Sequence, residues 1–284
     1  MQPSLPFQTS GYAVIPSFLA ESELRLFASA IEDVLSSARH VGMSRPGNDL
    51  IPLRWNDTVI ATTLRSEPHM RRLREVLQPD DLKWLSGYLT LKPPHSPALW
   101  WHQDWWCWDH QISFARTATQ VALLSYLTDT DVRNGALRVL PGSHHASTPI
   151  HRHLPEPHGA EANELPSDHA AMSDCPGQIT LSLKAGDAVV LDYRLLHGTH
   201  PNETEERRDC ILLSFIPAWR PLPSEIKAHL AAHPALPDHT EERLRTTSGY
   251  DGLLPRFSGV PASIPVNRVP PAYFRLMKPS APEG

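Results

Sequence analysis

The segment His102-Gln103-Asp104 places two metal-binding side chains two residues apart. In a β-strand, residues i and i+2 point to the same face, so this imidazole and this carboxylate can reach one ion. His197, far downstream, could supply a third ligand from the end of another strand. Two histidines and one carboxylate leave three positions of an octahedron open. That arrangement suits an Fe(II) ion that must bind a bidentate co-substrate and O2 together.

The His-x-Asp tripeptide alone is weak evidence for a metal site, and the chain contains other histidines that must be weighed. With 16 histidines and 31 acidic residues, a His-x-Asp/Glu match also arises by chance. His239-Thr240-Glu241 is such a match, and we interpret it as a helix start because Asp238 and Thr240 are typical capping residues. The histidines between residues 144 and 153 have no accompanying cysteine or carboxylate pattern, so we predict a polar loop there rather than a zinc site.

The elements that must position these residues begin with a short strand at 12–16 and two amphipathic helices. The first helix, about 21–37, has Phe27 and Ile31 on its apolar face, and the second spans 67–77. From about residue 84 the pattern is typical of strands. We predict them at 84–92, 98–104, 119–127, 136–140, 178–183, 187–193 and 209–216.

Many short strands joined by turns favour an all-β core with flanking helices, built as an antiparallel sandwich or jelly roll of the double-stranded β-helix, cupin-like kind. We expect a single domain over residues 1–284. Its parts are N-terminal helices (about 17–80), a jelly-roll core (about 84–220) and a Pro-rich C-terminal extension (about 221–284) with helical turns at 223–232 and 240–246. Residues 144–175 show no period and are predicted to form a long loop that, with Trp219, closes over the site.

Several short motifs follow one another along most of the chain. They are Gly11-Tyr12-Ala13-Val14-Ile15-Pro16, Leu91-Lys92-Pro93-Pro94, His102-Gln103-Asp104, the run from Asn134-Gly135-Ala136 to Leu140-Pro141-Gly142-Ser143-His144, Ala185-Gly186-Asp187, and Leu196-His197-Gly198-Thr199. In this order they resemble the phytanoyl-CoA dioxygenase family of Fe(II)/2-oxoglutarate oxygenases. The resemblance implies that His102, Asp104 and His197 are the catalytic iron ligands, and that Fe(II), 2-oxoglutarate and O2 are required.

The resemblance also assigns the residues that would bind 2-oxoglutarate. Arg208 follows His197 by eleven residues, which is the family's spacing for the arginine that pairs with the far carboxylate. Its surroundings, Glu203 to Arg207, are charged, so a solvated arginine is the alternative. Thr199 matches the family's hydroxyl contact, and Lys92 a further co-substrate position, unless Lys92 is a surface lysine before a Pro-Pro turn. Gln120, at a strand start, could offer its amide.

Tryptophans gather around the metal motif and suggest the substrate side. Trp105, Trp106 and Trp108 could wall a pocket for an apolar or ring-shaped small molecule. Trp101 is a fourth tryptophan beside the motif, and we expect two of these four to fill the core instead. The acidic balance would tolerate a cationic substrate such as an amino sugar. In the family, relatives that halogenate lack the carboxylate, so Asp104 favours hydroxylation or a related oxidation.

Composition excludes several other classes. The net charge is −5 without a basic block, which argues against nucleic acid. Cys107, Cys175 and Cys210 are far apart and form no CxxC pair, so we predict no disulfide framework and a reducing cytoplasm. We see no signal peptide and no membrane span. Two rivals stay open: a cupin-like metal enzyme that does not use 2-oxoglutarate, and a non-catalytic jelly roll that binds a small molecule. The first rival has no need of Arg208, and the intact set of His102, Asp104 and His197 argues against the second.

Overall fold

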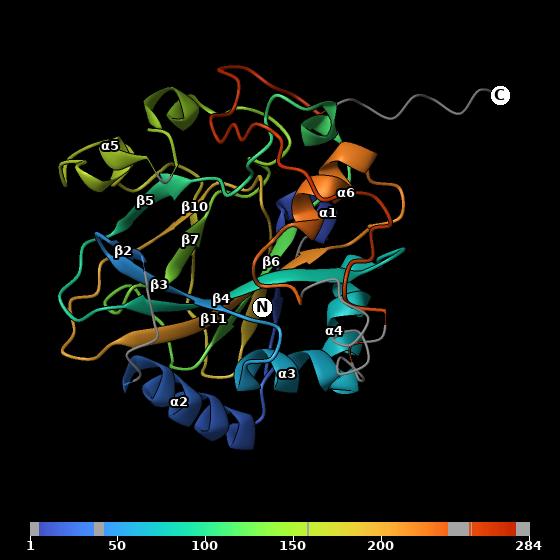
Figure 1. The fold of residues 1–284 in the computed structure, drawn as a ribbon. Helices are drawn as coiled ribbons and strands as arrows, with labels where there is room; N and C mark the ends of the chain where they lie inside the picture. The colour runs from blue at the N-terminus through green and yellow to red at the C-terminus, as the bar shows by residue number, and fades with distance from the viewer. Residues whose placement is uncertain (1–5, 37–42, 158, 238–249, 251, 277–284) are drawn as a thin grey trace.

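The computed structural model describes residues 6–36, 43–157, 159–237, 250 and 252–276. Two antiparallel sheets form the core (Figure 1). The larger has the order β1 (Tyr12–Ile15), β9 (Ala188–Asp192), β6 (Val121–Tyr126), β11 (Arg208–Ile216), β4 (Lys83–Lys92), β3 (Asn48–Leu53) and β2 (Met43–Arg45). The smaller has the order β5 (Leu99–His102), β10 (His197–Thr199), β7 (Leu137–Val139) and β8 (Ile179–Leu181).

Helices cover the outer face of the larger sheet (Figure 1). These are α2 (Glu21–Ser36), α3 (Thr58–Arg65) and α4 (Glu67–Leu77). The shorter helical elements are α1 (Phe7–Ser10), η1 (Gln111–Phe114), η2 (Pro149–His153), α5 (Ala160–Asn163) and α6 (Ser224–Ala231). None of the helices in the described part of the chain combines the length and apolar character needed to cross a bilayer.

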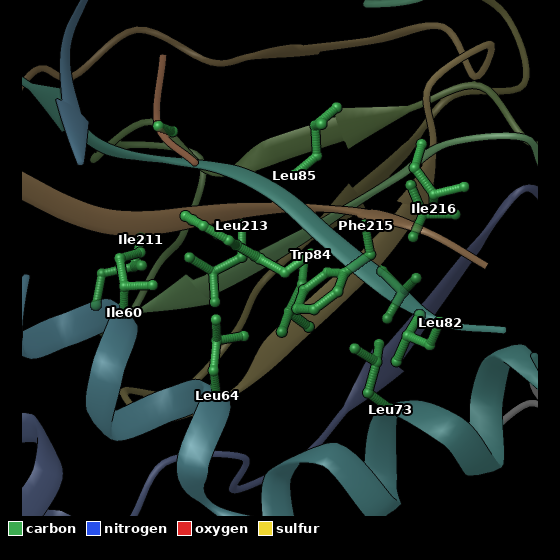
Figure 2. Packing of buried hydrophobic residues seen from close by; sticks show 14 of the residues in the cluster. Ile60, Leu64, Leu73, Leu82, Trp84, Leu85, Ile211, Leu213, Phe215 and Ile216 are labelled. Carbon is green, nitrogen blue, oxygen red and sulfur yellow. The ribbon is translucent and has the colours of Figure 1, made fainter. Parts of the chain in front are cut away.

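Alternation along the strands creates two apolar layers. Val121 and Leu123 of β6 pack with the helices, whereas Ala122 and Leu124 between them belong to the cluster enclosed by the two sheets. Figure 2 shows the outer layer, in which Leu64 of α3 lies below the sheet residues. The inner apolar cluster therefore lies between the two sheets, whereas helices cover the outer face of the larger sheet.

The predicted fold class is confirmed, and so are the predicted strands and the helices near 21–37, 67–77 and 223–232. The larger sheet starts earlier than the predicted core, because β2 and β3 had not been expected. Helix α3 was also missed. Its β-branched residues, among them Val59 and Ile60, favour strands in isolation, but both are buried under the sheet. The predicted turns at 240–246, and His239, lie outside the described residues.

The segment 144–175 differs from the predicted lid. It contains η2 and α5, and His144 and His151 within it are buried rather than part of a solvated loop. Burial lowers the pKa of both imidazoles to about 4. His144 lies by the carbonyl oxygen of Gln8 at 3.2 Å, and His151 completes a capping box with Thr148 at the start of η2. These histidines serve the packing of the segment.

Candidate active site

The three candidate metal ligands converge where β5 meets β10. These strands are antiparallel neighbours, and their register pairs His197 with His102. The ring centroids are 4.3 Å apart. Asp104, just beyond β5, places its carboxylate oxygens 3.7 Å from Nε2 of His102 and 3.5 Å from Nε2 of His197. One ligand atom from each residue lies within 4.8 Å of the other two, so a single ion can reach all three.

Backbone carbonyls orient both imidazoles. Nδ1 of His102 lies 2.9 Å from the oxygen of Trp100, and Nδ1 of His197 lies 3.0 Å from the oxygen of Leu195. A carbonyl only accepts hydrogen bonds, so each Nδ1 carries the proton and each Nε2 presents a lone pair. Two neutral imidazoles and one carboxylate are a donor set that fits Fe(II) with open coordination positions.

Glycine at position 198 allows the two ligand strands to approach each other. A Cβ there would lie 2.7 Å from the oxygen of Leu99 and 3.0 Å from that of Trp100. Such contacts would push β10 away from β5. The motif that includes His197-Gly198 therefore has a steric reason for its glycine.

Polar side chains fix the loop before β10. Arg194 and Asp192 form a buried ion pair at 2.7 Å. Burial opposes ionisation of Asp192, yet the guanidinium beside it holds the pKa of this carboxyl below its usual value. Gln103 donates its amide to the carbonyl of Arg194, and Ser143 Oγ accepts from the N–H of Leu196 at 2.9 Å. Gln103 of the metal tripeptide and Ser143 of the Pro-Gly-Ser-His run thus both stabilise the segment that contains His197.

The cluster faces a cavity of about 380 Å³ between the sheets. Its walls include aliphatic side chains and Trp106, and its polar lining contains, besides the three candidate ligands, mainly residues of the larger sheet and of the C-terminal extension. These polar lining residues include Arg45, Tyr88, Gln120, Thr199, Arg208, His229, His233 and Arg268.

Arg208 lies at the start of β11 and lines this cavity. It is 3% exposed, so the alternative of a solvated arginine is excluded. One Nη donates to the carbonyl of Gly135 at 3.2 Å, and the guanidinium lies 5.3 Å from the ring centroid of Tyr126. Its Nε is buried and has no hydrogen-bond partner in the described structure. A buried charged donor without a partner is costly, which indicates that an anionic ligand completes it.

Thr199 also lines the cavity, two residues after His197 on β10. Thr199 and Arg208 thus line the same cavity as the metal cluster, and their contact with 2-oxoglutarate stays a prediction. The Asn-Gly motif contributes indirectly, because its Gly135 carbonyl holds the arginine.

Lys92 differs from its predicted place. It is fully buried and absent from the cavity lining, with Nζ donating to the carbonyls of Gly47 and Pro97 at 2.9 and 2.7 Å. Its long side chain is held outside the cavity lining because those two carbonyls accept its hydrogen bonds. The alternative of a surface lysine is also wrong.

Lys92 provides a prediction about stability. Burial, with Arg208 and Arg138 nearby, lowers the pKa of Lys92 to about 6, against about 10.4 in an unfolded chain. Between these values the unfolded chain binds one more proton, so stability rises with pH by up to about 1.4 kcal/mol per unit. Urea unfolding at pH 7, 8 and 9 should show this slope, and Lys92→Met should lack it. Equal slopes in both proteins would contradict the buried neutral amine.

Gln120 lines the cavity, but its amide is already engaged. Its Oε1 accepts from Nε1 of Trp106 at 2.8 Å, and its Nε2 donates to Ser214 Oγ at 2.7 Å. It therefore positions Trp106 rather than offering a spare amide.

Of the three predicted substrate tryptophans, only Trp106 lines the cavity. It stacks on His229, with ring centroids 4.6 Å apart and an interplanar angle of 26°. Trp105 donates to Ser113 Oγ at 2.8 Å, and Trp108 packs on Phe274. Neither reaches the cavity, because the chain leaves the regular strand after His102 and its side chains no longer alternate. Trp101 and Trp219 are also buried outside the cavity lining.

Sequence reasoning missed Arg45, Tyr88 and Arg268. Arg45 ends β2, and Arg268 lies in the Pro-rich extension, where no period or motif marked it. Tyr88 lay in a predicted strand, but nothing in its alternation indicated which face would meet a ligand.

Comparison with known proteins places the chain in a family. A family model described as phytanoyl-CoA dioxygenase matches residues 7–210. The chain is 28% identical over 159 residues to a probable alpha-ketoglutarate-dependent hypophosphite dioxygenase of Stutzerimonas stutzeri, covering 56% of this chain and 53%, about half, of that relative. It is 26% identical over 224 residues to an L-proline trans-4-hydroxylase of Streptomyces griseoviridis, covering 72% and 82% of the two chains.

A solved structure supports the fold. HygX from Streptomyces hygroscopicus, with nickel and 2-oxoglutarate bound, matches 74% of this chain and 84% of that chain with a TM-score of 0.58 and 24% identity. The segment matched by the family model includes His102, Asp104, His197 and Arg208. The chain belongs to the phytanoyl-CoA dioxygenase family.

Proposed function

We propose that this protein is an Fe(II)- and 2-oxoglutarate-dependent dioxygenase that oxidises an unactivated C–H bond of a small molecule, with release of succinate and CO2. His102, Asp104 and His197 hold the iron, and Arg208 with Thr199 binds the far carboxylate of 2-oxoglutarate. One observation carries the proposal. A two-histidine, one-carboxylate cluster shares its cavity with a buried arginine whose Nε has no partner in the described structure.

The residues of the cavity also argue against both rivals. A cupin-like metal enzyme that does not use 2-oxoglutarate would have no use for a buried guanidinium with an unsatisfied donor. A non-catalytic binding protein would not need two imidazoles held in one tautomer with both Nε2 atoms facing a carboxylate.

The chain's own residues supply binding and orientation. When bound, Fe(II) and 2-oxoglutarate supply the activation of O2 and the oxidising equivalents. Arg208 fixes one end of 2-oxoglutarate by charge-assisted hydrogen bonds, which leaves its keto acid end directed toward the ligand cluster. Trp106, held by Gln120 and His229, forms a rigid wall for the substrate. The aliphatic side chains and Trp106 of the cavity wall present apolar surface to the substrate.

The relatives indicate the substrate class. Those named above are described as acting on L-proline and hypophosphite, both small molecules. A cavity of about 380 Å³ also suits a small molecule. In this family the carboxylate at Asp104 distinguishes hydroxylases from halogenating relatives, so we expect hydroxylation, desaturation, ring closure or ketone formation in biosynthetic or tailoring metabolism.

The thiols support a reducing compartment. Cys107 and Cys210 are buried and unpaired, and Cys175 is also a free thiol. We therefore propose the cytoplasm as the site of action.

Turnover of 2-oxoglutarate tests the proposed function. The protein with Fe(II), ascorbate and O2 should convert 2-oxoglutarate to succinate, slowly alone and faster with a substrate, and a chelator should abolish the conversion. Succinate is measured by chromatography. If a broad panel of small molecules yields no succinate, and anaerobic addition of 2-oxoglutarate to the Fe(II) protein produces no visible absorption band, the proposal fails.

A further inference from the structure

The cavity contains two more guanidinium groups besides that of Arg208. Arg45 arrives from the edge strand β2 and Arg268 from the C-terminal extension, and both line the cavity beside Tyr88. Asp104 and Arg268 are close enough to affect the pKa of Arg45, which burial chiefly lowers. Neither arginine forms an ion pair with a carboxylate in the described part of the chain.

The extension is fixed in place rather than lying loosely over the opening. The N–H of Asn267 donates to the carbonyl of Trp106 at 2.9 Å, and the N–H of Trp108 donates to the carbonyl of Asn267 at 3.0 Å. The amide of Asn267 also donates to Asp109 at 2.6 Å. Arg268 follows immediately, and one Nη donates to the backbone carbonyl of Asp104 at 3.2 Å. This cation is thereby positioned next to the ligand cluster.

The charges of the described residues that line the cavity do not balance without a further anion. Among the described lining residues, Asp104 is the one carboxylate, whereas Arg45, Arg208 and Arg268 are cations. In the proposed enzyme, Asp104 and the two carboxylates of 2-oxoglutarate balance iron and Arg208. The guanidinium groups of Arg45 and Arg268 then have no countercharge among the described lining residues.

The lining histidines neither add to that charge nor offset it. Burial lowers the pKa of His233 to about 4 and lowers that of His229, where Arg268 contributes as well. Both imidazoles are therefore neutral near pH 7. A site that leaves two guanidinium groups uncompensated in a partly buried cavity favours a ligand that brings negative charge.

We propose that Arg45 and Arg268, with Tyr88 beside them, form a subsite for an anionic group of the primary substrate, a carboxylate, phosphate or sulfate on a largely apolar body. The inference rests on the proposed function and adds the substrate's charge to it. It is the opposite of the cationic substrate expected from the net charge of −5, because three of the charged residues that line the cavity are arginines and one is a carboxylate. The segment after residue 210, beyond the family match, thus contributes to specificity.

Binding of matched small molecules tests this subsite. The probes are phenylacetate, phenyl phosphate, phenylacetamide and phenethylamine, titrated into protein loaded with Ni(II) and saturated with 2-oxoglutarate, so that Arg208 is occupied and no turnover occurs. Quenching of tryptophan fluorescence reports binding beside Trp106. At least one anion should bind about 10- to 100-fold more tightly than the amide, and the amine most weakly. The two anions distinguish a carboxylate site from a phosphate site.

Variants separate the subsite from the rest of the cavity. Arg45→Gln and Arg268→Gln should each remove most of the preference for the anion while leaving amide and 2-oxoglutarate affinity unchanged, and Arg268→Lys should retain more of it. Arg220→Gln is the control, since Arg220 is an exposed residue paired with Asp80 outside the cavity lining. Equal affinity for anion and amide, or no binding of either anion, overturns the proposal, as does a preference that survives both glutamine variants.

The two proposals can fail separately. If the wild-type Ni(II) protein does not bind 2-oxoglutarate, the proposed function fails. The probes are then compared on the metal-free protein, where an anion preference lost in Arg268→Gln still supports the subsite and its absence overturns it.

Discussion

Replacing His197 by alanine is expected to reduce Fe(II) affinity by more than about 100-fold and to abolish succinate formation. Loss of a residue that merely supports a metal ligand already costs about 10- to 100-fold, and loss of a ligand should cost more. The effect should be on the metal site, because the His197 side chain contacts Asp104 and the Leu195 carbonyl and has no other hydrogen bond among the residues that the structure describes. Equilibrium dialysis with Fe(II) under anaerobic conditions measures it.

His200→Ala is the matched control for this prediction. His200 lies three residues further on and is about equally buried, but its Nε2 lies 2.8 Å from Thr180 Oγ1 and it does not line the cavity. The His200→Ala protein should bind one Fe(II) with the affinity of the wild type. Equal losses in both variants, or thermal unfolding of metal-free His197→Ala far below that of the control, would attribute the effect to folding instead of ligation.

The second large effect is expected at Arg208. Arg208→Gln should weaken 2-oxoglutarate binding by about 2–5 kcal/mol, because it removes a buried charged partner of a carboxylate. Fe(II) affinity should be unchanged, since Arg208 is not among the candidate ligands. Arg208→Lys should recover only part of the loss, because an ammonium group cannot form two parallel hydrogen bonds to one carboxylate. Isothermal titration of the Ni(II) protein with 2-oxoglutarate measures the change.

The neighbouring arginine provides the control. Arg207 pairs with Asp209 and Glu32 on the surface, outside the cavity lining, so Arg207→Gln should keep wild-type affinity for 2-oxoglutarate. If both variants lose affinity equally, the charge of the turn matters and the specific contact proposed for Arg208 is wrong.

Much of the site was predictable because it depends on local order. Residues 102 and 104 are close in sequence, and the downstream motif had to pair with their strand for the jelly roll to form. Arg208 reaches the cavity from the larger sheet, where β11 pairs with β4 and β6, whereas His197 lies on β10 of the smaller sheet, and the cavity between the sheets is lined by both residues.

The rest depends on where long side chains end and on contacts distant in sequence. Lys92 lies in the predicted strand, yet its four-carbon side chain is long enough for the amine to donate to the Gly47 and Pro97 carbonyls. Arg45 and Arg268 are more than 200 residues apart and approach each other only because the extension pairs with the backbone of Trp106 and Trp108. No spacing or period in the sequence encodes that contact, so the positive charge of the residues that line the cavity could not be predicted before the fold was known.

The most direct measurement is a crystal structure of the protein grown anaerobically with Fe(II) and 2-oxoglutarate, with iron located by anomalous scattering. The account predicts one iron peak bonded to Nε2 of His102, Nε2 of His197 and the carboxylate of Asp104, with the far carboxylate of 2-oxoglutarate on Arg208. An iron peak elsewhere, or 2-oxoglutarate bound without contact to Arg208, would contradict it.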